Sequence, residues 1–157
     1  MINLIKTQDD NTSTTAAIAR LARAITLSQG QFSLLLVCCN SSNKQQLMSL
    51  LNEFLPIAIA QLSLPASAQT LYTTISSAIG SNHPEALIVD GLESVVAINQ
   101  LIISTNLMRD EFRKQFQFPL VLRVNDEILR KLLLLAPDLK DWAATTIRID
   151  LPDHVLV

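Results

Sequence analysis

The stretch that decides the fold runs from Phe32 to Cys39, FSLLLVCC, and is followed by NSSNKQQ and an apolar helix pattern. Apart from Ser33 the segment is apolar, which predicts a strand buried on both faces, as in the middle of a parallel sheet. Further along, Ala86–Glu93, ALIVDGLE, predicts a second buried strand that ends in acids. An α/β protein that binds nucleotide has this order of elements: a strand, a phosphate-binding turn, a helix and later a strand that ends in a magnesium-binding acid.

The rest of the chain alternates in the same way. We expect strands at 32–38, 57–62, 86–89, 119–124 and 145–149. Helices are expected from an N-cap within 9–14 to about 27, at 44–54, from Ser67 or Gln69 to 79, from 94 to about 115 and at 126–135, with a short turn or helix at 137–142. In the long helix, the residues expected to face the core are Val95, Ile98, Leu101, Ile102 and Leu107. Five strands alternating with helices predict a single α/β domain over 1–157, a three-layer α/β/α sandwich around a mostly parallel five-stranded sheet. Residues 1–12 are expected to be loosely ordered.

Composition narrows the possible functions. The chain is 49% hydrophobic and 17% charged, with a net charge of −2 and 4% aromatic residues, which disfavours binding to nucleic acid or to an anionic membrane. No apolar run is long enough to cross a bilayer. Cys38 and Cys39 are adjacent and should point to opposite faces of a strand, as expected for reduced thiols of a cytoplasmic protein. His83 and His154 have no ligand at metal spacing, so no metal site is predicted.

The polar turn keeps only part of a phosphate-binding loop. In G-x-x-x-x-G-K-[ST] the glycines let backbone N–H groups close around phosphate, and the hydroxyl binds magnesium. Alignment on Lys44 places Cys38 and Asn43 at the two glycine positions and Gln45 at the hydroxyl position. Asn43 is a weak substitute for glycine, because asparagine tolerates positive φ. The alternative is a strand-to-helix turn in which a residue of 40–42 caps the helix.

Three polar residues follow two of the predicted strands. Asp90 and Glu93 come after the third strand, where an acid can hold magnesium and a second can orient water, but Asp-Gly-Leu-Glu is also a turn and helix start. Asn125 ends the fourth strand, where it could sense a terminal phosphate, or it could cap the next helix, with Asp126 as a competing cap.

A partner surface is expected at the charged end of the long helix and near the single tryptophan. Its residues are Arg109, Arg113, Lys114 and Trp142. A chain this apolar either covers its sheet fully or keeps a face for a partner.

Three stretches resemble a known family: LLLVCCN, EALIVDGLES and the run from Asn106 to Asp150, which contains FPLVLRV and APDLKDW. They are similar to a degenerate P-loop NTPase-like domain, of AAA or STAND type, at the front of large bacterial and especially cyanobacterial signalling proteins that carry repeats. The resemblance covers about residues 15–150. It implies strand order 5-1-4-3-2 and a role in signalling or assembly. Of the family's nucleotide-site residues, it matches only Lys44, Asp90 and Glu93 in this sequence.

The sequence therefore favours a non-catalytic interaction domain that needs no cofactor. Its partner would be another part of its own polypeptide, another protein or a second copy. The alternative is a switch that binds ATP or GTP with magnesium through Asn43, Lys44, Asp90 and Asn125 and hydrolyses it weakly or not at all. We assign no catalytic residue.

Overall fold

The computed structural model describes residues 2–40, 44–143 and 146–151, with side chains for all of these except 2–12 and Lys44. The elements in chain order are α1 (Ile2–Leu27), β1 (Ser33–Cys38), α2 (Lys44–Phe54), β2 (Ala60–Ser63), α3 (Leu71–Ile79), β3 (Leu87–Asp90), the 3-10 turn η1 (Leu92–Ser94), α4 (Ile98–Leu107), α5 (Arg109–Gln115), β4 (Pro119–Val124), α6 (Asp126–Leu135), α7 (Pro137–Trp142) and β5 (Thr146–Arg148). Among the described helices, none is both long and apolar enough to cross a membrane.

The strands form one sheet in the order β2-β3-β4-β1-β5, which is the predicted order 5-1-4-3-2 read from the other edge. All four pairings are parallel, so the predicted parallel sheet is confirmed. In the central pair Leu36 lies opposite Leu122, and the register runs without interruption from Ser33 to Cys38. All six residues of β4 are buried, which fits a strand covered on both faces.

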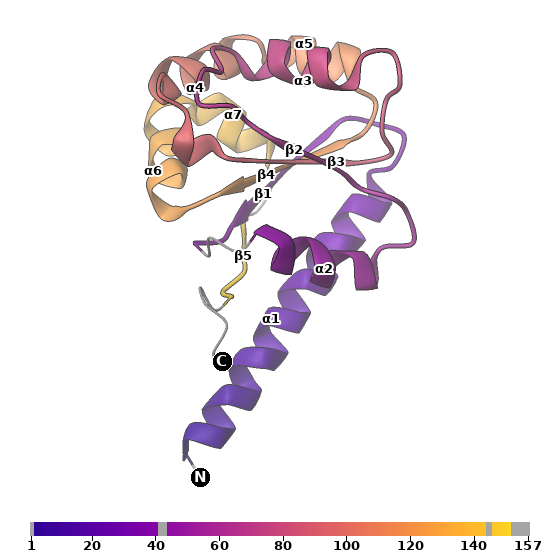
Figure 1. The fold of residues 1–157 in the computed structure, drawn as a ribbon, viewed down its shortest axis with the longest axis vertical. Coiled ribbons are helices and arrows are strands. Elements are labelled where there is room, and N and C mark those ends of the chain that lie inside the picture. The colour runs from indigo at the N-terminus through magenta and orange to yellow at the C-terminus, as the bar shows by residue number, and fades with distance from the viewer. Residues whose placement is uncertain (1, 41–43, 144–145, 152–157) are drawn as a thin grey trace.

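Helices cover the sheet on both faces, and each face has its own core (Figure 1). Alternate residues of β1 divide between them, because successive side chains of a strand point to opposite faces. Leu36 and Cys38 pack in the core under α3 to α7, whereas Val37 and Cys39 pack in the core under α1 and α2. The predicted three-layer sandwich and the opposite orientation of the two buried, unbonded cysteines are therefore confirmed.

The first helix is longer than predicted. It begins at Ile2, before all of the N-cap candidates at 9–14, and its N-terminal half extends past the sheet (Figure 1). The backbone of the segment expected to be loosely ordered is thus helical. The helix ends before Gly30, whose φ of +82° reverses the chain toward β1.

The predicted long helix at 94–115 is wrong, because the chain forms η1, α4 and α5 there instead. Val95 is extended and buried, and the amide of Val96 donates to the carbonyl of Ala66 at 3.0 Å, so the helix cannot begin before Ile98. A second break at Met108 separates α4 from α5. Leu107, expected in the core, is the last residue of α4 and is 76% exposed.

Candidate functional site

The candidate site lies at the carboxyl edge of the sheet, where the predicted polar residues follow their strands. Ligands of open parallel sheets bind at this edge. Of the loop that follows β1, Asn43 lies outside the described residues. Lys44 is the first residue of α2, and its side chain is also outside the description. The predictions for these two residues therefore stay predictions.

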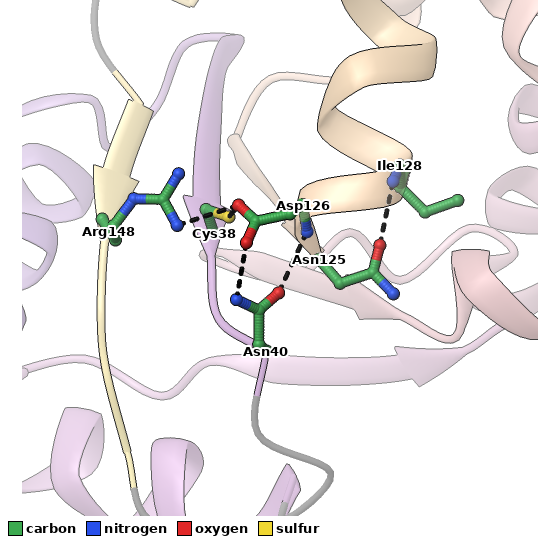
Figure 2. Close-up of polar contacts among 6 residues, drawn as sticks. All are labelled: Cys38, Asn40, Asn125, Asp126, Ile128 and Arg148. Carbon is green, nitrogen blue, oxygen red and sulfur yellow. Dashed lines mark hydrogen bonds and ion pairs between the residues drawn. The ribbon is translucent and has the colours of Figure 1, made fainter.

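Asp126 joins the ends of β1, β4 and β5 (Figure 2). Its carboxylate accepts from the Nδ2 of Asn40 at 2.8 Å, from the NH1 of Arg148 at 2.9 Å and from the Sγ of Cys38 at 3.4 Å. The backbone amide of Asp126 donates in return to the Oδ1 of Asn40 at 3.0 Å. We call these four residues the Asp126 network.

The network fixes the charge of its members. The Asn40 amide, the Arg148 guanidinium and the Cys38 thiol, in that order of effect, lower the pKa of Asp126 to about 2. Burial, followed by the hydrogen bond to Asp126, raises the pKa of the Cys38 thiol to about 11. At neutral pH the carboxylate is therefore charged, and the thiol remains a neutral donor instead of a nucleophile.

A second polar cluster lies on the opposite face of the sheet, at the end of β3. Asp90 is only 2% exposed, and both of its carboxylate oxygens accept hydrogen bonds from β2. The Nε2 of Gln61 donates at 3.0 Å and the Oγ of Ser63 at 2.7 Å. Arg123 of β4, 5% exposed, occupies the position next to the paired residues Val89 and Leu122, so it falls opposite Asp90 on this face.

The turn after Asp90 is fixed by close backbone packing. The amide of Leu64 donates to the carbonyl of Asp90 at 2.9 Å. Gly91 adopts φ +87°, and a Cβ at this position would lie 3.1 Å from the Leu64 amide nitrogen. Glycine is thus required for both its conformation and its size. Glu93, two residues further, is exposed in η1 and does not join the Asp90 cluster.

Asn125 is placed by its role as a helix cap. It precedes α6 in an extended conformation, and its Oδ1 accepts from the amide of Ile128 at 2.8 Å. This arrangement satisfies one of the first free amides of the helix, as an N-cap does. The capping interpretation of Asn125 is confirmed, and Asp126 takes the next position.

The residues of the predicted partner surface come together only in part. The guanidinium of Arg113 lies 4.2 Å from the ring centroid of Trp142, and that of Arg109 lies 5.9 Å away, both within range of cation–π attraction. Arg109 also lies 3.7 Å from the carboxylate of Asp138. Lys114 faces Glu111 of its own helix at 3.9 Å.

Sequence reasoning missed Arg123 and Arg148 as partners of the strand ends. The signal for Arg123 was its position inside FPLVLRV, since a charge in a strand buried on both faces needs a compensating group nearby. The contact between Arg148 and Asp126 depends on the pairing of β5 with β1 and could not be read from spacing. Among the described residues, no group of three or more His, Cys, Asp or Glu side chains is arranged to hold a metal.

Comparisons by sequence give no relative. No protein-family model matches the chain, and a search of the curated proteins gives no match either.

Solved structures do match by shape. The ORC2 protein of Aeropyrum pernix in its ADPNP–ADP complexes aligns with a TM-score of 0.57 at 12% identity, over 87% of this chain and 46% of that one. The ADP form of the same protein aligns with a TM-score of 0.54 at 13% identity, over 87% of this chain and 47% of that one. A RuvB mutant from Thermogota maritima aligns with a TM-score of 0.50 at 16% identity, over 91% of this chain and 45% of that one.

The chain spans just under half the length of the structures it matches. At these identities the likeness concerns the fold alone. Together with the strand order, it shows that this chain has the α/β fold of the AAA+ P-loop NTPases.

Proposed function

We propose that this chain is a non-catalytic AAA+-like domain that works by binding protein. The observation that carries this proposal is the state of Asp90, the strand-end acid. Protein-bound Mg²⁺ usually keeps several waters and needs a carboxylate that is open to them. Asp90 is buried, and Gln61 and Ser63 bond its two oxygens. A carboxylate held in this way is suited to anchoring β2 against β3.

The Asp126 network supports the same conclusion from the other face of the sheet. A phosphate-binding loop offers backbone N–H groups to an anion. Here, Asn40 and Arg148 direct their donors at the chain's own carboxylate, and Cys38 replaces the glycine that would begin such a loop. The carboxyl edge therefore uses its polar groups to join strands.

The partner would bind elsewhere on the domain. Arg109, Arg113 and Trp142 form one stacked cluster, and Lys114 lies on the same helix. Arginine and tryptophan are enriched in interface hot spots, since both combine a large contact area with directional bonding. We propose that the partner is a protein or another part of the same polypeptide, in a signalling or assembly role as the sequence resemblance implies.

A calorimetric and thermal-shift titration tests this function. ATP and GTP, each with magnesium, are added to the wild-type chain and to Lys44→Ala. We expect no binding heat and no change in melting temperature for either protein, because any ligand that binds the native state must stabilise it. Millimolar or tighter binding that is lost in Lys44→Ala would contradict the proposal.

That contrary result would favour the second candidate, a nucleotide-binding switch with weak or absent hydrolysis. Its support is the likeness to ORC2, whose structures are described as ADPNP and ADP complexes. In this chain Lys44 begins the helix after β1 and Asp90 ends β3, the places where such a switch needs a lysine and an acid. Asn43 and Asn125 would be its other ligand contacts.

A further inference from the structure

A small cavity lies at the edge of the sheet where β3 and β4 begin, opposite the carboxyl edge that holds Asp90 and Asp126. Its volume is about 150 Å³, and its walls belong to α3, to the loop before β3 and to the end of α5. Both helices lie in the layer on one face of the sheet (Figure 1). Since a benzene ring fits in a cavity of roughly 150 Å³, there is room here for one small planar group.

Aromatic rings form one wall of this cavity. The ring of Tyr72 stacks on that of Phe116, with the centroids 5.3 Å apart and an angle of 29° between the planes. Phe112 packs against Tyr72 in a T-shaped arrangement at 5.5 Å, and His83 packs against Phe116 in the same way at 6.3 Å. Tyr72 is only half-buried and lines the cavity, so part of its ring is accessible to a ligand. Aromatic rings of this kind attract cations.

Two helices end at the same cavity. The last residue of α3 is Ile79 and its C-cap is Gly80, whereas the last residue of α5 is Gln115 and its C-cap is Phe116. All four of these residues line the cavity. The last carbonyl groups of a helix have no partner within it, and they give that end a partial negative charge. The two helix ends therefore favour a positively charged ligand and disfavour an anion.

The polar side chains of the lining add acceptors without adding charge. Ser76 contributes a hydroxyl group and Gln115 an amide, and the oxygen of each can accept a hydrogen bond. Among the described residues that line the cavity, none is lysine, arginine, aspartate or glutamate. The two basic residues before Gln115 contact other groups: Arg113 lies over the ring of Trp142, and Lys114 faces Glu111.

We propose that this cavity binds the guanidinium group of an arginine side chain from a partner protein. A guanidinium group is planar, stacks on aromatic rings and has five N–H donors, so it can contact Tyr72 while it donates to Ser76 and Gln115. A lysine ammonium has the charge but not the planar stack. The cavity admits the planar head group alone, and the rest of the partner segment stays outside. This inference rests on the proposed function, because it names the kind of protein that the domain binds.

An NMR titration of the full chain with N-acetyl-arginine amide tests the proposal. Tyr72 is the single tyrosine, so its ring signals report on the cavity directly. We expect these signals to shift with a dissociation constant of roughly 1 to 30 mM, because the contacts are few and individually weak. N-acetyl-citrulline amide has a similar shape but no charge, and it should bind about tenfold more weakly. Equal binding of the two compounds, or no saturable shift of Tyr72, would overturn the proposal.

Two matched variants show whether the ligand binds in the cavity. Gln115→Lys places an ammonium group in the lining at an exposed position, and it should weaken the binding of N-acetyl-arginine amide at least about tenfold. Gln117→Lys makes the same change at an exposed glutamine that is not part of the lining, and it should change the affinity by less than about twofold. Equal weakening by both variants would show that the ligand follows the surface charge, and would refute the cavity as its site.

Free arginine distinguishes a protein partner from a small molecule. If the partner is a protein segment, N-acetyl-arginine amide should bind at least as tightly as free arginine. Clearly tighter binding of free arginine would overturn the assignment to a protein.

The titrations with nucleotide are independent of this site. Nucleotide binding by a protein whose Tyr72 still responds to the arginine compound would contradict the proposed function but not the guanidinium site. A protein that binds neither nucleotide nor the arginine compound would contradict the guanidinium site alone.

Discussion

Replacing Asp90 with alanine should lower the free energy of unfolding by about 3 to 5 kcal/mol. The side chain is 2% exposed and accepts at 3.0 Å from Gln61 and at 2.7 Å from Ser63. A hydrogen bond to a charged acceptor contributes about 1.5 to 3 kcal/mol, and Asp90 accepts two such bonds from the exposed side chains of Gln61 and Ser63. The substitution also removes a buried negative charge from the face on which the buried Arg123 lies, and breaking a buried charge arrangement typically costs about 3 to 5 kcal/mol.

Urea denaturation measures this loss. With a slope of about 2 kcal/mol per molar urea, the midpoint should fall by about 1.5 to 2.5 M. The melting temperature should fall by roughly 6 to 20 °C for a domain of this size. Glu93→Ala is the matched control: this acid is exposed three positions along the chain, and its loss should change stability by less than about 0.5 kcal/mol.

The experiment separates two roles of the same residue. An acid kept for binding magnesium or nucleotide is held at some cost in stability, and removing it leaves stability unchanged or raises it. An acid kept to anchor β2 destabilises the fold when it is lost. If Asp90→Ala proves as stable as the wild type, the structural interpretation of Asp90 is refuted, and the nucleotide-binding switch becomes the better proposal.

Three further perturbations follow from the contacts at the same edge. The pKa of Asp126 is lowered from 3.8 to about 2, so the charged carboxylate stabilises the fold. The stability advantage of the wild type over Asp126→Asn should therefore be complete above pH 3.8 and disappear as the pH falls through about 2. Urea midpoints measured at each pH test this expectation. Asn125→Ala should cost about 1 kcal/mol in urea denaturation through the lost cap of α6, whereas Asn125→Asp, an equally good cap, should cost almost nothing. Gly91→Ala and Gly30→Ala both place a side chain at positive φ, but only Gly91 lies against the backbone of Leu64, so Gly91→Ala should lower the melting temperature clearly more than Gly30→Ala; equal effects would show that the contact is unimportant.

Much of the fold could be predicted from periodicity. The apolar run before the polar turn gave a central strand, and the helix at 44–54 was predicted with its exact bounds because Phe54 is soon followed by Pro56. Local chemistry offered a helix cap as one of two roles for Asn125, and the structure confirms the cap. These features depend on neighbouring residues, which a sequence displays directly.

The errors came from interactions between distant segments. The long helix was interrupted because Val96 bonds to Ala66, a residue of another connection, and helix periodicity cannot register such a contact. Leu107 was assigned to the core because it continued the apolar stripe of a helix that ends at this residue. The Asp126 network joins residues from three segments of the chain, so its composition follows from strand order and not from spacing.

The two polar clusters together explain how this sheet can keep the AAA+ arrangement without a glycine loop. In a phosphate-binding protein the bound anion and its magnesium compensate the donors and acids at the carboxyl edge. Here, Asp90 accepts from Gln61 and Ser63 and shares its face with the buried Arg123, whereas Asp126 on the other face pairs with Arg148. Carboxylates that the chain itself already bonds, as these two are among the described residues, gain little from a ligand. We therefore expect partner binding to depend on the helical layer, where the guanidinium groups of Arg109 and Arg113 lie near the ring of Trp142.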